Sequence, residues 1–117
     1  MPLMTSKLLG SGIDVMTLPE GHMSCVQCQG YKFECWNYGD SHRIELGCMA
    51  CGESYRLLFP LDIVLPEKQG RYSCLRHPSK GMIVIHNIDV LSVGCECCYT
   101  EMNIQLKTKS NIILADA

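Results

Sequence analysis

Cysteine is the residue type in this chain whose number and spacing best define a possible chemistry. Nine cysteines occur among 117 residues, and four of them form two C-x2-C pairs separated by 19 residues. The first set is Cys25, Cys28, Cys48 and Cys51. A two-residue spacer lets both thiolates of a pair face one ion, and a gap of this length accommodates a hairpin that brings the pairs together. The spacing predicts one tetrahedral metal site.

The second half of the chain repeats this arrangement with one substitution. When the first C-x2-C pair is shifted by 49 positions along the chain, it falls on a C-x2-H pair. When the second pair is shifted by 47 positions, it falls on a further C-x2-C pair. The second set is Cys74, His77, Cys95 and Cys98. A spacing repeat of this kind indicates one supersecondary unit used twice. Replacement of a second-site ligand by Cys97 or His86 remains open at this stage.

The ligand types favour zinc at both sites, and we therefore expect two zinc ions. Sulfur-rich tetrahedral sites with a histidine suit zinc, although the all-cysteine site is also compatible with iron. Isolated buried thiols are the alternative interpretation, and the matched spacing of four pairs argues against it. The first residues do not form a secretory signal, and the number of cysteines is odd. Both observations disfavour a disulfide framework and predict a cytoplasmic protein.

The segments between the ligand pairs alternate apolar and polar residues as half-buried strands do. YKFECW and HRIEL flank a turn at residues 38–41, and a third strand follows with Tyr55, Leu57 and Phe59 on one face. MIVIH, DVLSV and EMNIQLK repeat the scheme in the second half. The predicted fold is mainly β, with two small antiparallel sheets, each pinned by one zinc ion.

CVQC with CMACG, and more loosely CLRH with CECC, resembles the zinc-ribbon family over residues 23–107. The resemblance implies tandem zinc ribbons. The expected organisation is an N-terminal arm (1–22), ribbon 1 (23–60), a linker (61–71), ribbon 2 (72–107) and a C-terminal tail (108–117). The chain lacks the proline that often follows the first cysteine in this family, and His77 departs from an all-cysteine set.

Each half needs its metal to fold, because about 40 residues bury too little apolar surface to offset chain entropy. A structural zinc ion contributes roughly 10 to 16 kcal/mol of apparent binding free energy, which acts as folding free energy in such modules. Four protein ligands also close the zinc coordination shell, and no HExxH motif or phosphate-binding loop occurs. We therefore predict a protein that is not an enzyme, with thiol redox activity as a minor alternative. Cys35 and Cys97 lie outside both ligand sets.

Charge gives a second indication of function. The formal net charge is −2, and counting the two zinc–thiolate centres as −2 and −1 brings it to −2 − 2 − 1 = −5. General nonspecific binding to nucleic acid is not expected of an acidic protein, because Lys and Arg must displace counterions from the phosphates. A basic segment is nevertheless a candidate RNA or DNA contact, with Tyr72 and Tyr99 able to stack on bases and Lys107 and Lys109 able to extend it. Its residues are Lys68, Arg71, Arg76 and Lys80. An ordinary solvated linker is the alternative.

Apolar content favours a protein partner. LLFPLDIVLP at 57–66 and NIILA at 111–115 exceed what two thin ribbons need for their interiors, and exposed apolar patches mark partner or oligomer contacts. No apolar run approaches the roughly 20 residues that a membrane helix needs, so we predict no segment that spans a bilayer. The sequence therefore predicts a zinc-binding interaction module that docks on a larger protein assembly as an adaptor, a regulator or a small inhibitor. Homo-oligomerisation remains open.

Overall fold

A computed structural model describes residues 15–106 and 112–116, apart from the side chains of 99–101. Within these ranges the chain is built from strands and turns and contains no α-helix. Every strand pairs antiparallel with its neighbours in one of two sheets. The expected mainly β fold is confirmed. None of the described residues forms a helix with the length and apolar character that crossing a bilayer requires.

Sheet A has six strands in the order β1-β10-β5-β4-β3-β6. Its strands are β1 (Val15–Thr17), β3 (Phe33–Tyr38), β4 (Arg43–Cys48), β5 (Ser54–Leu58), β6 (Gly70–Tyr72) and β10 (Ile113–Asp116). A 3-10 turn, η1 (Gly39–Ser41), joins β3 to β4. His42 leaves this turn in the left-handed region with φ of 52°, and its N–H donates to the Gly39 carbonyl at 3.0 Å. The predicted hairpin turn is therefore present.

Sheet B has four strands in the order β2-β7-β8-β9. Its strands are β2 (Gly21–His22), β7 (Ile83–His86), β8 (Val90–Cys95) and β9 (Tyr99–Gln105). The register between β8 and β9 shifts at Val93 and Gly94, which marks a β-bulge just before the ligand Cys95. A bulge bends the strand at this point and alters the direction of the side chains that follow.

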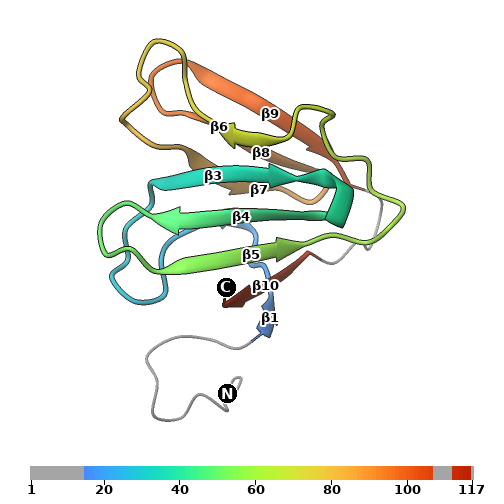
Figure 1. Ribbon diagram of the computed structural model, residues 1–117. Helices are drawn as coiled ribbons and strands as arrows, with labels where there is room; N and C mark the ends of the chain where they lie inside the picture. The colour runs from blue at the N-terminus through green and yellow to red at the C-terminus, as the bar shows by residue number, and fades with distance from the viewer. Residues whose placement is uncertain (1–14, 107–111, 117) are drawn as a thin grey trace.

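The two sheets lie against one another, with β7 and β8 behind β3 and β4 in the view of Figure 1. Alternate residues of the strands point inward, as period-2 patterning requires. The resulting core is one cluster to which both sheets contribute, including Phe33 and Leu57 from sheet A and Val84 and Ile104 from sheet B. A backbone bridge between Phe33 and Met82 joins the layers directly, because each residue donates its N–H to the other's carbonyl.

Segments outside the expected ribbons also supply strands. β2, from the predicted arm, pairs with β7, and β6, at the end of the predicted linker, pairs with β3. β10, from the predicted tail, lies between β5 and β1. The boundaries of the two ribbons stay a prediction. Residues 1–14 of the arm and residues 108–111 and 117 of the tail lie outside the described residues, as do Lys107 and Lys109.

Candidate metal centres

The first centre forms where a loop from sheet B to sheet A meets a turn of sheet A. Cys25 and Cys28 lie in the loop between β2 and β3, Cys48 ends β4, and Cys51 lies in the turn before β5. All four sulfur atoms lie within 4.8 Å of one another. The Cys25–Cys51 and Cys28–Cys48 sulfur pairs are 3.6 and 3.5 Å apart, close to the ~3.8 Å edge of a tetrahedron with ~2.3 Å zinc–sulfur bonds. All four cysteines are free thiols.

Backbone hydrogen bonds shape the first pair of ligands into a tight loop. The Cys25 N–H donates to the Gly30 carbonyl at 2.7 Å, and the Gly30 N–H points at the Cys28 sulfur at 3.4 Å. A Cβ at position 30 would lie 3.3 Å from the Cys28 sulfur, a tight contact that Gly30 avoids. Gly52 follows the second pair directly, adopts a positive φ of 83°, and donates to the Cys48 carbonyl at 2.8 Å.

A buried tyrosine supports the first centre from the third strand. The Tyr55 hydroxyl lies 3.2 Å from the Cys25 sulfur and accepts the Val26 N–H at 3.0 Å. Burial opposes ionisation of Cys25, but hydrogen bonds from Tyr55 and nearby backbone N–H groups outweigh it and lower the pKa of the Cys25 thiol to about 7. The sequence assigned Tyr55 only to a strand face, because alternation shows that a side chain points inward but not which ligand it meets.

The second centre repeats the plan, with its first pair after a strand of sheet A and its second pair on sheet B. Cys74 and His77 follow β6, Cys95 ends β8, and Cys98 precedes β9. The four ligand atoms again lie within 4.8 Å of one another. His77 Nδ1 lies 3.7, 3.6 and 3.4 Å from the sulfurs of Cys74, Cys95 and Cys98. Because all three sulfurs surround this nitrogen, Nδ1 is the atom placed to bind a metal. A tetrahedral site with zinc bonds of ~2.3 and ~2.1 Å needs sulfur–nitrogen separations of ~3.6 Å.

The thiols of the second cluster have unequal pKa values, as do those of the first. The Cys97 N–H donates to the Cys95 sulfur at 3.4 Å, and such backbone donors lower the pKa of Cys95. A hydrogen bond with Cys74, together with burial, raises the pKa of Cys98 to about 11. Neighbouring thiols resist joint ionisation because the second thiolate meets the charge of the first. Zinc removes this conflict, since a bound Zn²⁺ replaces the protons and holds the thiolates together. The expectation of two clusters suited to two zinc ions is confirmed.

Cys97, His86 and Cys35 lie outside both clusters. Cys97 is exposed. His86 is buried, with Nδ1 3.1 Å from the carbonyl oxygens of Leu18 and Pro19. Cys35 is fully buried, and burial raises the pKa of its thiol to about 12. A thiol with so high a pKa is a poor nucleophile, and Cys35 is a packing residue of sheet A.

One ion pair connects the surroundings of the two centres. Lys32 precedes Phe33, which pairs with the ligand Cys48, and Glu96 follows the ligand Cys95. The Lys32 ammonium lies 2.9 Å from the Glu96 carboxylate. This contact holds the pKa of Glu96 below its ordinary value. The two centres therefore lie at the same end of the molecule.

The four residues of the predicted basic segment have different surroundings. Arg71 lies 3.7 Å from Glu34, and Lys68 lies over the Tyr72 ring, 5.0 Å from its centroid. Tyr72 is buried and its hydroxyl donates to the Lys68 carbonyl, so the expected stacking of this ring on bases is wrong. The ring packs inward because Tyr72 pairs with Cys35 on the core face.

The other two residues of the basic segment, Arg76 and Lys80, lie in the loop of the second centre. The Tyr99 side chain lies outside the described residues.

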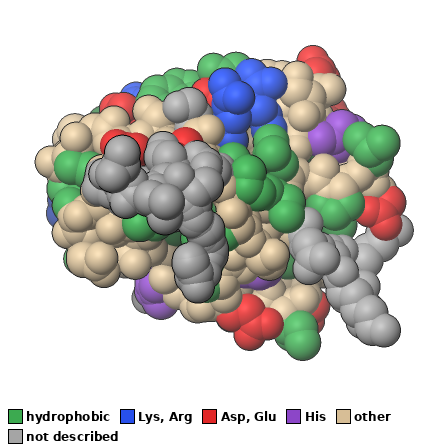
Figure 2. All heavy atoms as spheres, turned by 90° about the horizontal axis from the view of Figure 1, so that it is seen from below, with side chains coloured by type: hydrophobic (Ala, Val, Ile, Leu, Met, Phe, Trp, Pro, Cys, Tyr) green, Lys and Arg blue, Asp and Glu red, His purple; other side chains and the backbone are tan. Residues whose placement is uncertain are grey.

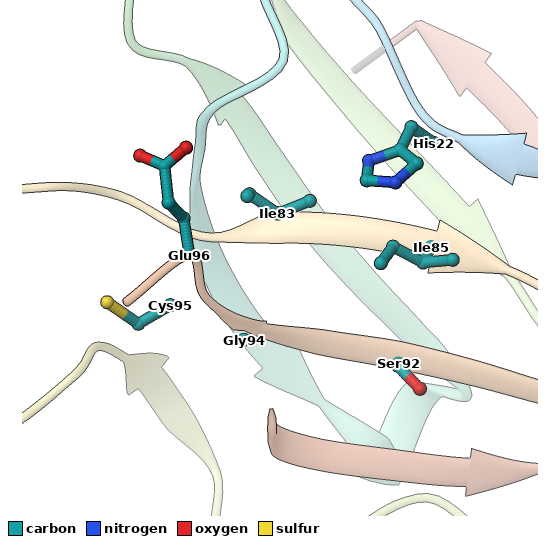
Figure 3. Close-up of a pocket in the computed structure, with 7 residues that line it drawn as sticks. All are labelled: His22, Ile83, Ile85, Ser92, Gly94, Cys95 and Glu96. Atoms are coloured by element: carbon teal, nitrogen blue, oxygen red, sulfur yellow. The ribbon is translucent and has the colours of Figure 1, made fainter. Parts of the chain in front are cut away.

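A shallow hollow of about 310 Å³ adjoins the second centre on the outer face of sheet B. It exists where Gly94 has no side chain beside Ile83 (Figure 3). Ile83 and Ile85 form its apolar floor, Glu96 lies at one end, and His22 lies at the other. The ligand Cys95 also lines the hollow, and its sulfur points away from the isoleucines.

Comparison of the chain with protein families, with curated proteins and with solved structures finds no match. The class of the protein is therefore defined by its own fold and sites. It is a mainly β protein with one four-cysteine cluster and one cluster of three cysteines and a histidine. Both the topology of strands around the clusters and the ligand sets are consistent with zinc ribbons.

Proposed function

We propose that this protein is a tandem zinc ribbon without enzymatic activity, which docks on a larger protein assembly as an adaptor, regulator or small inhibitor. The observation that carries the proposal is the pair of four-ligand clusters. Four protein ligands fill a tetrahedral zinc shell, whereas catalytic zinc keeps one position open for water or substrate. Zinc at both centres then cross-links the chain into a rigid fold, and the surface of that fold binds the protein partner.

Exposed apolar side chains support a protein partner. Large hydrophobic residues are more than three quarters exposed in three separate loops, and they are Leu61, Val64, Leu75 and Ile88. Single exposed apolar residues are ordinary, but several in loops around a small protein leave surface that a partner can bury. The hollow on sheet B adds an apolar floor of a size that accommodates a side chain of a partner.

Two measurements test the proposal. Elemental analysis of the purified protein is expected to give two zinc ions per chain, and one ion or none would refute it. A tagged holoprotein is then expected to retain a specific protein from a native lysate, while the chelated protein does not, because the docking surface depends on the metal. Equal capture by both forms would show that the folded surface is not what binds.

The nucleic-acid alternative makes an opposite prediction. Affinity for short single-stranded RNA would fall steeply with salt and disappear when Arg71 and Arg76 are both changed to Gln, because phosphate contacts release counterions. We expect weak binding that the double substitution does not abolish. Strong salt-dependent binding that requires both arginines would replace protein docking as the function.

A further inference from the structure

The outer face of sheet A gathers residue types that dominate binding energy in protein interfaces. We name it the Arg–Trp face, and it comprises Trp36, Tyr38, Arg43, Arg56 and Arg71. Three of the four arginines of the chain and its single tryptophan lie there. The cross-strand register places Arg71 opposite Trp36, Trp36 opposite Glu45, and Glu45 opposite Arg56. One row therefore crosses four adjacent strands.

The charges on this face do not balance. Glu45 accepts the Arg43 Nε–H at 2.8 Å and forms an ion pair with Arg56, whose Nε lies 3.3 Å from the same carboxylate oxygen. Arg71 makes the longer 3.7 Å contact with Glu34 and donates to the Pro78 carbonyl at 3.4 Å. Three guanidinium groups thus share two carboxylates, which leaves a local excess of one positive charge. The side chains of Arg56 and Arg71 are 48% and 45% exposed, so both retain unused donors toward solvent.

The aromatic side chains lie beside the charged ones on this face. A Cβ added to Gly47 would lie 3.7 Å from Trp36 Cζ3, so the indole extends over the bare backbone of the neighbouring strand. The Arg43 guanidinium lies 4.8 Å from the centroid of the Tyr38 ring, which is 37% exposed. Tryptophan, tyrosine and arginine are the residues most enriched among interface hot spots. In the view from below, a group of basic side chains borders hydrophobic ones on the surface (Figure 2).

We propose that the Arg–Trp face is the docking surface for a protein partner that presents a carboxylate beside an aromatic or aliphatic side chain. The inference rests on the proposed docking function and names its site. The apolar group of the partner packs on Trp36, and its carboxylate takes the donors that Arg56 and Arg71 leave unused, which are suited to paired hydrogen bonds. Nucleic acid fits less well, because Glu34 and Glu45 would lie against a continuous row of phosphates on a protein that is already acidic.

The experiment uses the single tryptophan as its reporter. The zinc-loaded protein is titrated with a random copolymer of Glu, Ala and Tyr, and Trp36 fluorescence is followed. We expect a fluorescence change on binding, and an affinity loss of about tenfold or more when Arg56→Gln and Arg71→Gln are combined, because hot-spot charges are each worth more than 1 kcal/mol. The control combines Lys68→Gln and Lys80→Gln, which removes the same charge outside the face. It should lose no more than about twofold, the level of surface charges that make no contact.

The alternative results are distinct. No binding of the copolymer, or equal weakening by both double variants, would overturn the proposal. Stronger binding of a single-stranded oligonucleotide that requires Arg56 and Arg71 would assign the face to nucleic acid instead. Zinc content and near-UV circular dichroism confirm that each variant is folded. If the arginine variant still captures the same lysate protein as the wild type, docking stands and this face is not its site; if the wild type captures none, docking itself fails.

Discussion

The two metal centres share a plan and differ in what supports them. In each, one ligand of every pair is buried, and the other lies nearer the surface. At the first centre, four thiolates are assisted by the Tyr55 hydroxyl. In the second, His77 takes the place of a thiolate, and the position that corresponds to Tyr55 by the 47-residue repeat is the buried Met102. Four thiolates around Zn²⁺ carry a charge of −2, and three with a neutral imidazole carry −1.

This difference shows how a repeat can keep its ligand geometry while its surroundings diverge. A more negative centre gains more from a hydrogen-bond donor, and Tyr55 supplies one beside the buried Cys25. The centre with less charge has an apolar methionine at that position. The first centre is also more deeply part of the fold, because Cys25 and Cys48 belong to the hydrophobic cluster, and Cys74 and Cys95 do not.

The largest expected effect is removal of both ions. Excess chelator should abolish the near-UV signal of Trp36, because zinc contributes roughly 10 to 16 kcal/mol per site and a domain has only about 5 to 15 kcal/mol of net stability. The measurement is near-UV circular dichroism with zinc quantified in parallel. A zinc-free protein that keeps its native signal would show that the joined core folds without metal and that both centres are accessory.

Substitutions that remove one centre at a time should distinguish the contributions of the two centres to stability. Cys48→Ser and Cys95→Ser are each expected to bind one zinc ion instead of two. Cys48→Ser should cost about 1 to 3 kcal/mol more free energy of unfolding, because it places a hydroxyl inside the hydrophobic cluster as well as removing a ligand. Denaturant titration of both variants checks the order. A smaller loss in Cys48→Ser would mean that the second centre is the main anchor.

The ligand spacing and the strand alternation predicted much of this architecture. Both clusters consist of residues identified from the spacing alone, and the burial alternation of β3, β4 and β8 follows the sequence pattern. Short edge strands could not be predicted. β2 has two residues and β6 three, too few for a period-2 signal, and their partners lie far along the chain. For the same reason the burial of Tyr72 was missed.

Support of the first centre by Tyr55 is testable with a matched pair of substitutions. Tyr55→Phe keeps the ring and removes the hydroxyl, which leaves the Val26 N–H without this partner and the Cys25 sulfur without the tyrosine donor. We expect a loss of about 1 to 3 kcal/mol in stability and about 10- to 100-fold in zinc affinity at the first centre. Met102→Leu at the corresponding position should cost less than about 1.5 kcal/mol and leave zinc affinity unchanged. Competitive chelator titration measures both. Equal affinities in the two variants would assign Tyr55 to packing alone.

The smallest expected effect concerns the link between the centres. Lys32 and Glu96 are each more than a third exposed, so solvent and salt screen their ion pair. Lys32→Gln and Glu96→Gln should leave zinc stoichiometry at two and shift the unfolding midpoint only slightly. In a double-mutant cycle, the coupling between them should shrink as salt is raised. The strands and the shared core already join the two halves of the chain. Removal of the ion pair should therefore not allow the region of one centre to unfold before that of the other. Two separate transitions in the doubly substituted protein would show that the ion pair, rather than the shared core, unites the centres.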